Sequence, residues 1–417
     1  MPSYCGLDFG TSNSTVATIG KDGPFLIPVE DSRTAIPTVV FFRYDDNKIL
    51  YGQAAIGEYV SGTEGRQMRS LKSILGTELM YEKTRLAKTS VAFADVIGAF
   101  IRQLKRQAET FLGDAVDSVV LGRPVHFVDN DAEGDGRAQS ELEAIARKQG
   151  FHCVEFQLEP IAAAMAYQTQ VQRRAVALII DAGGGTSDFS VVELHPTRGP
   201  GFAGGTRILA SHGVRIGGTD FDASIARRSI MPLLGYLCPL IRGGMVMPSW
   251  IYGDLSAWRK INFLYTDRVV TMVRELKDLA SEPHLVDRLL RVLRSRLGHA
   301  ILMEVERAKI DLTSSDLAAC DLTAIEDGLS VSISNADLGA AIGSEMRSIF
   351  AGIAETVRLA GLRFDQIGKV FTTGGSTAVP MMSHWIDANF PAAEVVEGDR
   401  FGSVGKGLAL DAQQRFA

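Results

Sequence analysis

Short apolar runs that end at a glycine-containing turn recur along this chain. They occupy residues 4–7, 119–121, 177–180 and 370–371. Runs of this length, bounded by tight turns, predict buried strands of about 4–6 residues. Apolar residues at helical spacing predict helices over residues 95–112, 138–149, 285–310 and 337–360, with Gly113 and Gly150 as C-caps and Asn335 as an N-cap. Strands mixed with helices predict an α/β fold.

One strand-and-turn element occurs twice. The sequence LDFGTS at residues 7–12 recurs as IDAGGGTSD at residues 180–188. Each copy has a strand, an aspartate, one spacer, a glycine and a small hydroxylated turn. The two copies lie too far apart for a short-repeat solenoid. We therefore predict a duplicated domain, in which each half presents an Asp-Gly turn to a shared cleft.

Composition and charge exclude several classes of protein. A chain of 417 residues with 46% hydrophobic and 22% charged residues is expected to form two or three globular domains. Its 43 Lys+Arg against 49 Asp+Glu, a net charge of −6, argue against general binding to nucleic acid. No apolar run reaches the ~18 residues of a membrane helix. The start lacks the features of a signal peptide, and four widely spaced cysteines suit reduced thiols, so we expect a cytoplasmic protein.

The glycine turns suggest a particular chemistry. A glycine-rich turn after a strand lets backbone N–H groups point at an anion, and several such groups can hold a phosphate. An aspartate directly before the turn would repel that phosphate unless a cation such as Mg²⁺ lies between them. Two facing turns therefore predict a bound Mg-nucleotide. A single turn of this kind is more often an ordinary turn, and the GxxxxGK[ST], HExxH and GxSxG motifs are absent.

Six motifs together resemble a known family. Residues 6–14 and 181–188 resemble the first and second phosphate loops of the DnaK-type heat-shock chaperones, in the actin-like ATPase superfamily. Residues 158–167 are similar to the helix that links the lobes of that family. The remaining motifs follow in the family's order at residues 217–222, 306–309 and 374–377. The resemblance runs from about residue 4 to 410.

The resemblance implies a two-lobed actin-like ATPase fold. Each lobe would have a ribonuclease-H-like β-sheet core, and a central cleft would hold ATP or ADP with Mg²⁺. Lobe I would span residues 1–173, with an outer subdomain near 37–90 and a returning C-terminal helix at 402–412. Lobe II would span residues 174–400, with an outer subdomain near 223–303.

The resemblance also implies roles for matching residues. Asp8 and Asp181 would hold Mg²⁺ through water, Lys72 would neutralise phosphate charge, and the attacking water would be positioned by Glu159, Thr186 and Asp188. The implied catalytic residues are Lys72, Glu159, Asp181, Thr186 and Asp188. The implied phosphate contacts are Gly10, Thr11, Ser12, Asn13, Gly183, Gly184, Gly185, Gly217 and Gly218. The implied ribose and adenine contacts are Glu306, Lys309, Ile310, Thr313, Gly374, Gly375, Ser376 and Ala378.

Two of these residues have simpler interpretations, and three positions depart from the family. Lys72 could be a surface lysine, and Lys309 could form a solvated pair with Glu306. Ile310 and Ala378 stand where the family stacks adenine between two arginines. Loss of both cation–π contacts would weaken adenine binding by roughly one or two orders of magnitude. Thr219 replaces an acidic residue, which is expected to slow hydrolysis.

The expected function is a chaperone-like switch with weak, Mg-dependent ATPase activity. The chain ends before the linker and peptide-binding domain of a complete chaperone, so it most resembles short, YegD-like members. Two alternatives stay open: a small-molecule, sugar-type kinase on the same fold, and a regulatory module that binds nucleotide without hydrolysing it. The aromatic-rich segment 223–303 could be core or could contact a protein partner or client. No nucleic acid or membrane partner is expected.

Overall fold

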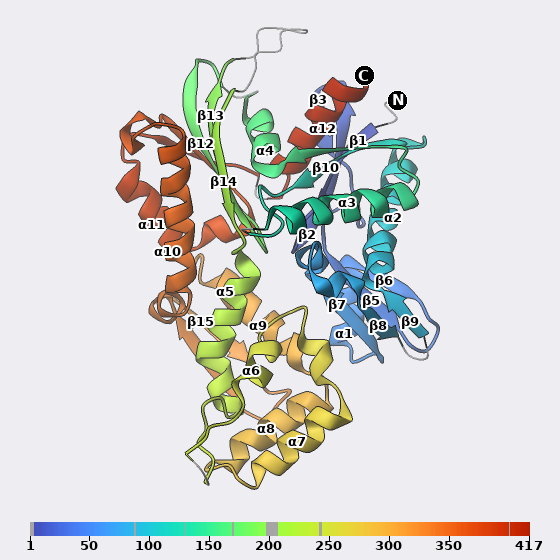
Figure 1. Ribbon diagram of the computed structural model, residues 1–417, viewed down its shortest axis with the longest axis vertical. Coiled ribbons are helices and arrows are strands. Elements are labelled where there is room, and N and C mark those ends of the chain that lie inside the picture. Colours follow the sequence, from blue (N-terminus) through green and yellow to red (C-terminus); the bar gives the residue numbers. More distant parts are fainter. Residues whose placement is uncertain are drawn as a thin grey trace. The chain divides into compact units, whose positions relative to one another are not determined.

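The computed structural model describes residues 4–86, 89–129, 131–168, 171–196, 207–241, 244–399 and 401–417. The chain divides into two compact units (Figure 1). The first unit comprises Met1–Gly217, Ser348–Thr377 and Met382–Ala417, and the second comprises Gly218–Arg347 and Ala378–Met381. The lobe boundaries that the sequence suggests stay a prediction.

Two large sheets with the same topology form the first unit. The strands of the first sheet are β1 (Tyr4–Phe9), β2 (Asn13–Gly20), β3 (Gly23–Leu26), β10 (Ser118–Arg123) and β11 (Cys153–Leu158), with β4 (Ala35–Pro37) paired to β2. Those of the second are β12 (Ala175–Ala182), β13 (Ser187–Leu194), β14 (Arg207–Val214), β17 (Lys369–Thr373) and β18 (Glu394–Glu397). The orders are β3-β2-β1-β10-β11 and β14-β13-β12-β17-β18.

Strand directions also match between the two sheets. In each, the first strand pairs antiparallel with the second and parallel with a later strand that follows a helical connection. Thus β1 corresponds to β12, β2 to β13 and β10 to β17. The structure confirms the α/β class and the duplication that the repeated strand-and-turn element predicts.

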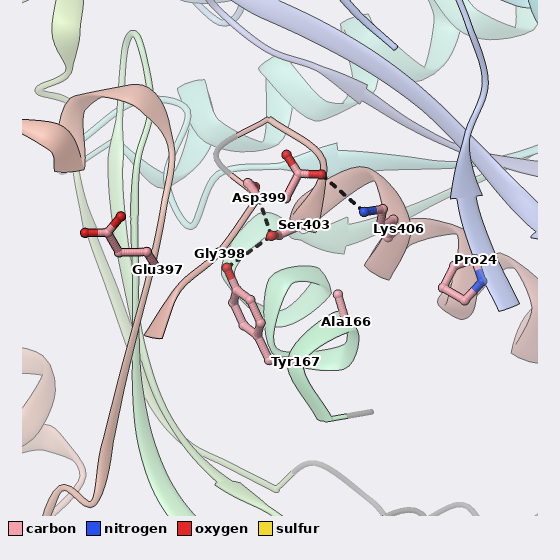
Figure 2. Close-up of a pocket in the computed structure, with 8 residues that line it drawn as sticks. All are labelled: Pro24, Ala166, Tyr167, Glu397, Gly398, Asp399, Ser403 and Lys406. Carbon is pink, nitrogen blue, oxygen red and sulfur yellow. Dashed lines mark hydrogen bonds and ion pairs between the residues drawn. The ribbon is translucent and has the colours of Figure 1, made fainter. Parts of the chain in front are cut away.

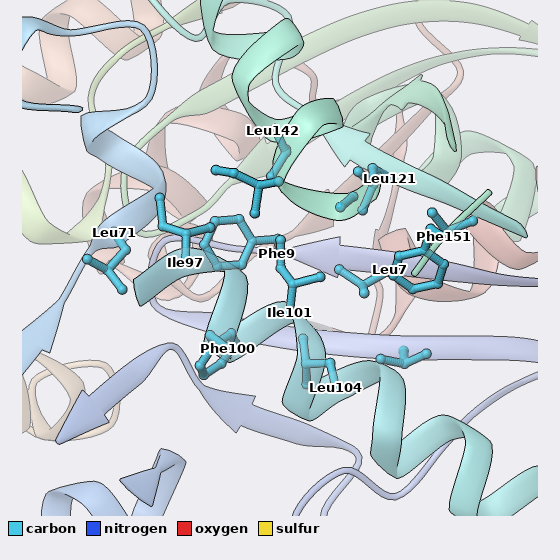
Figure 3. Close-up of a cluster of buried hydrophobic side chains, with 14 of the residues drawn as sticks. Leu7, Phe9, Leu71, Ile97, Phe100, Ile101, Leu104, Leu121, Leu142 and Phe151 are labelled. Atoms are coloured by element: carbon cyan, nitrogen blue, oxygen red, sulfur yellow. The ribbon is translucent and has the colours of Figure 1, made fainter. Parts of the chain in front are cut away.

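The first sheet is covered on one side by α2 (Phe93–Leu112) and α3 (Ala132–Lys148). Figure 3 shows Leu7 and Phe9 of β1 packed with Ile97, Phe100 and Ile101 of α2. All five of these side chains are fully buried. Side chains alternate across a strand, so the two inward residues place Asp8, which lies between them, on the opposite face of the sheet.

Helices α4 (Glu159–Gln168) and α12 (Ser403–Phe416) share a core with both sheets. Small residues allow their close approach. A Cβ atom on Gly407 of α12 would lie 1.7 Å from the carbonyl oxygen of Ala162 in α4. This contact explains the alanine run of α4, which packs by backbone proximity instead of by large side chains.

Smaller elements complete the first unit. The strands β5 (Val39–Arg43), β6 (Ile49–Tyr51) and β7 (Gly65–Arg69) form a separate sheet, and β8 (Lys83–Leu86) pairs with β9 (Thr89–Ala92). The helical elements nearby are α1 (Gly52–Val60), η1 (Leu71–Ile74) and η2 (Glu78–Tyr81). The short helix η1 is important for the site because it carries Lys72.

The second unit is mainly helical. Its principal helices are α5 (Gly218–Ile225), α6 (Ser249–Leu255), α7 (Asp267–Lys277), α8 (Pro283–Arg294) and α9 (Gly298–Asp311). The strands β15 (Leu317–Asp321) and β16 (Ser330–Ser334) form a hairpin. Two further helices, α10 (Asn335–Leu359) and α11 (Pro380–Asn389), include residues of both units. Tyr252 and Trp258 belong to the core, whereas Trp250 and Phe263 are exposed.

Three helix predictions are wrong in detail. Helix α3 begins at Ala132 instead of residue 138, and its C-cap is Gln149 instead of Gly150. The single helix predicted over 285–310 is broken between α8 and α9, where Arg296 adopts a left-handed conformation with φ 54°. The backbone N–H of Gly298 there donates to the hydroxyl of Tyr265 at 2.9 Å. At α10, the N-cap is Ser334 instead of Asn335, because its hydroxyl and backbone N–H exchange hydrogen bonds with Asp337. Gly113 is confirmed as a left-handed C-cap.

Two further observations bear on location. Within the described residues, no helix combines the length and the apolar character needed to cross a membrane. Cys5, Cys153, Cys238 and Cys320 are free thiols, of which Cys153 is exposed and the others are buried.

Candidate nucleotide site

The first candidate turn joins β1 and β2. Asp8 lies opposite Thr15 in this hairpin, and Gly10, Thr11 and Ser12 form the connection. A Cβ atom on Gly10 would lie 2.1 Å from the carbonyl oxygen of Asn13, so the turn closes only because residue 10 is glycine.

The second candidate turn joins β12 and β13 in the same way. Asp181 lies opposite Asp188, and the N–H of Gly183 donates to the carbonyl oxygen of Thr186 at 2.9 Å. Asp181 also lies beside Thr373 of the parallel strand β17. Asp181 therefore stands at the end of its strand, in the position that corresponds to Asp8.

The two turns touch each other within the first unit. A Cβ atom on Gly184 would lie 2.1 Å from the hydroxyl oxygen of Ser12, and one on Gly185 would lie 2.6 Å from that of Thr11. Gly217 packs against the same loop, because a Cβ atom on Gly217 would lie 2.5 Å from the amide nitrogen of Gly185. The glycines thus make room for a close approach of backbone to backbone, and the structure brings Asp8 and Asp181 to one place.

A third glycine turn follows β17. Gly374 has a positive φ of 83°, and a Cβ atom there would lie 2.2 Å from the carbonyl oxygen of Ala182 and 2.9 Å from Oδ1 of Asp181. The next turn residues are Gly375, which is exposed, and Ser376, whose hydroxyl donates to the carbonyl oxygen of Gly183 at 2.7 Å. This turn is therefore fastened directly to the second hairpin.

Lys72 is a buried lysine, only 6% exposed, which excludes its interpretation as a surface residue. Its ammonium group forms an ion pair with the carboxylate of Glu159 at the start of α4. Burial alone would lower the pKa of Lys72, but the carboxylates of Glu159 and Asp8 outweigh that effect and raise it. Lys72 is therefore positively charged and held beside the two hairpins.

Several carboxylates share the environment of this single cation. Burial, followed by the charge of Glu159, raises the pKa of Asp8 to about 7 and that of Asp188 to about 7. Burial and the charges of Glu159, Asp188 and Asp8 raise the pKa of Asp181 well above its ordinary value. These carboxyl groups repel one another, and Lys72 compensates only part of their charge.

Asp188 has one satisfied and one unsatisfied oxygen. Its Oδ1 accepts a hydrogen bond from the backbone N–H of Val125 at 2.6 Å, and the side chain is 1% exposed. Within the part of the chain that the structure describes, its Oδ2 has no partner at hydrogen-bond geometry, although the side chain of Thr186 lies close enough to lower the pKa of Asp188. Val125 was not predicted as a site residue. No local motif marks a backbone donor, so only the fold identifies it.

This set of groups fits a hydrated divalent cation. Surplus negative charge and a buried oxygen without a partner are both relieved by a cation or by the water around it. Among these carboxylates, Asp8 and Asp181 end equivalent strands beside the glycine turns, as the sequence predicts for the two Mg²⁺-binding residues. The chemistry of the donors therefore agrees with the expected cofactor.

Four predicted residues lie in or just after helix α9 of the second unit, namely Glu306, Lys309, Ile310 and Thr313. The strongest contacts of Lys309 are with buried groups of helix α5. Its ammonium group contacts Oδ1 of the buried Asp222 at 2.6 Å and the carbonyl oxygen of Gly218 at 3.0 Å. Trp258 donates to the other oxygen of Asp222 at 3.0 Å. Ile310 is exposed, and the partly exposed members of the predicted set in this unit are Glu306, Lys309, Thr313 and Ala378.

The ion pair of Lys309 therefore has a structural role that sequence reasoning missed. Asp222 is the last residue of the motif at residues 217–222, but the sequence predicted no function for it. Its partner, Lys309, lies 87 residues away in the sequence. Burial raises the pKa of Asp222, while the nearby Lys309 acts in the opposite direction. The remaining predicted site residues, apart from Gly218 and Ala378, lie in the first unit.

Comparison with known protein families agrees with the family resemblance of the two hairpin turns. The family model described as Hsp70 protein matches residues 4–231. This stretch is more than half of the 417-residue chain. It contains both repeated hairpins, Lys72 and Glu159. It ends before residues 306–313 and 374–378, for which the expected base and ribose contacts depend on the shorter motifs alone.

Proposed function

This chain belongs to the Hsp70 family, whose members bind ATP or ADP, and on that premise we propose a specific site and reaction. The chain binds Mg·ATP at the facing turns of Asp8 and Asp181 and hydrolyses it slowly. Hydrolysis serves as a conformational switch, in which the lobes close on ATP and open after release. The observation that carries this proposal is the contact between two equivalent glycine turns beside one lysine and four carboxylates.

Binding of the phosphates follows from the two turns. Backbone N–H groups at residues 10–13, 185 and 186 donate to the phosphate oxygens. The hydroxyl groups of Thr11 and Ser12 are close enough to the second turn to add to them. Lys72 supplies a fixed positive charge for the developing phosphate charge. When bound, Mg²⁺ would neutralise the phosphate oxygens, held through its waters by Asp8 and Asp181.

Proton handling falls to Asp188, and Glu159 has a positioning role. The unsatisfied Oδ2 of Asp188 can accept a hydrogen bond from the attacking water, while Val125 holds the other oxygen in place. A pKa near 7 suits a group that takes up a proton at neutral pH. Glu159 orients Lys72 through their ion pair. Thr219 replaces the acidic residue that the resemblance leads one to expect, which supports a slow reaction.

A single-turnover assay tests this proposal. Radiolabelled ATP is mixed with excess protein and Mg²⁺, and phosphate release is compared between wild type, Lys72→Ala and Lys48→Ala. Lys48 is an exposed lysine of the same unit and serves as the control. We expect Lys72→Ala to lower the rate about 10²-fold or more, and Lys48→Ala to leave it unchanged.

Two outcomes would contradict the proposal, and a third would show only that the variant unfolds. Equal background rates in all three proteins would indicate a nucleotide-binding module without hydrolysis. Rapid turnover only after a sugar is added would favour a kinase. Loss of activity in Lys72→Ala together with a collapsed melting transition would reflect unfolding, so circular dichroism melts accompany the assay.

Partner and location are further parts of the proposal. Exposed apolar side chains gather in the second unit, where Leu237, Ile241 and Met245 are 57%, 70% and 61% exposed. These residues support a protein partner or client at segment 223–303. A cytoplasmic location is proposed from family membership.

A further inference from the structure

Phe401 is a large apolar side chain that remains 45% exposed in the first unit. Two of its ring atoms, Cε1 and Cζ, lie 3.7 and 3.8 Å from the place where a Cβ atom on Gly375 would be. The edge of the ring therefore lies directly over the backbone of Gly375. Any side chain at residue 375 would come into contact with the ring.

The opposite end of this glycine turn belongs to the candidate site. Gly374 packs against Oδ1 of Asp181, and Ser376 donates to the carbonyl oxygen of Gly183. With neighbouring Cα atoms about 3.8 Å apart, the ring lies on the order of 10 Å from the Asp181 carboxylate. Gly374 and the exposed Gly375 thus lie between the second hairpin and the ring.

The backbone at Phe401 is held in place by its neighbours. Oδ1 of Asp399 accepts hydrogen bonds from the N–H groups of Phe401 at 3.4 Å and Gly402 at 3.1 Å. Figure 2 shows the other bonds of this segment, which borders a cavity of about 310 Å³. Asp399 pairs with Lys406 at 3.2 Å, and Ser403 bonds to the hydroxyl of Tyr167 at 3.1 Å. An exposed ring on a fixed backbone loses little freedom when a ligand binds.

We propose that Phe401 stacks against the base of the bound nucleotide. This inference rests on the proposed function and adds the residue that recognises the base. The positions expected to supply arginines carry Ile310 and Ala378, so this chain lacks both guanidinium groups. An aromatic ring beside Gly375 replaces their cation–π contacts with stacking. Stacking tolerates different bases because each has a flat π face, so the site accepts purine nucleotides with little discrimination.

Paired titrations of two ligands test the assignment. Isothermal titration calorimetry in Mg²⁺ compares ATP with inorganic tripolyphosphate, which has the phosphates but no base. The variants are Phe401→Ala, Phe401→Trp and the control Phe111→Ala, which removes a phenylalanine of the same unit that is 51% exposed. We expect Phe401→Ala to weaken ATP binding about 10-fold and to leave tripolyphosphate binding unchanged. Phe401→Trp and Phe111→Ala should bind ATP as wild type does.

Each contrary result has a distinct meaning. Unchanged ATP affinity in Phe401→Ala would overturn the stacking role while leaving the proposed function intact. An equal loss for both ligands would also overturn it, because the ring would then support the phosphate site and not the base. A wild-type protein that binds neither ligand would refute the proposed function, and this inference with it.

Discussion

Replacing Asp188 by asparagine should change the stability of the ligand-free protein in opposite directions at low and high pH. The pKa of this carboxyl rises from an ordinary 3.8 to about 7 in the folded chain. The folded state therefore binds a proton more tightly than the unfolded state, and stability falls as pH rises from about 4 to about 7. A pKa rise of this size lowers the free energy of unfolding by about 4 kcal/mol once the group is fully ionised.

The asparagine variant avoids the cost of a buried charge but adds a smaller cost, that of an amide group without a hydrogen-bond partner. Its amide carries no charge, so above pH 7 it gains up to about 4 kcal/mol over wild type. Placing an NH₂ group where Oδ2 already has no partner among the described residues costs about 1–3 kcal/mol. We therefore expect Asp188→Asn to be about 1–3 kcal/mol more stable than wild type at pH 8. At pH 5, where Asp188 is protonated, it should be equally or less stable.

Thermal melts in EDTA without nucleotide measure this effect. A difference of 1 kcal/mol shifts Tm by about 2–4 °C for units of this size. Asp22→Asn, which changes an exposed aspartate of the same unit, controls for general charge effects and should show no such reversal. A Tm difference of the same sign and size at pH 5 and pH 8 would refute the electrostatic account of the carboxylate cluster.

Two other substitutions test the packing. Asp222→Asn removes the charged buried partner of Lys309 and should cost about 3–5 kcal/mol, measured by urea unfolding followed by far-UV circular dichroism. A loss under 1 kcal/mol would contradict the structural role of this ion pair. Gly407→Ala should cost more than about 4 kcal/mol or prevent folding, because its Cβ atom would overlap Ala162. Gly57→Ala, in helix α1 with open space around it, should instead stabilise by about 0.5–1 kcal/mol, and similar effects of the two alanines would argue against the packing of α4 and α12.

The repeated hairpins could be predicted from the sequence because their signals are local. An apolar run, an aspartate and a glycine turn lie within nine residues, and each hairpin forms from neighbouring strands. The α/β class follows from the same runs. The break between α8 and α9 could not be predicted, because it depends on Tyr265 bonding to Gly298 from another segment.

Partners distant in the sequence account for the parts of the site that were missed. Lys72 meets Glu159 across 87 residues, and Asp188 meets Val125 across 63. Nothing near Lys72 indicates that it is buried, and nothing near Lys309 indicates that Asp222 holds it. The family resemblance implied that Lys72 and Glu159 belong to one site, but their ion pair and the pairing of Lys309 with Asp222 both required the fold. Phe401 lies in no motif at all and is visible only through its contact with Gly375.

Anomalous diffraction from crystals grown with Mn²⁺ and ADP would test the central claim most directly. Manganese replaces magnesium in sites built of oxygen ligands and gives a strong anomalous signal. The account predicts one peak near the carboxylates of Asp8 and Asp181, separated from them by water, with the phosphates against the two glycine turns. A peak elsewhere on the molecule, or ADP bound away from these turns, would contradict it.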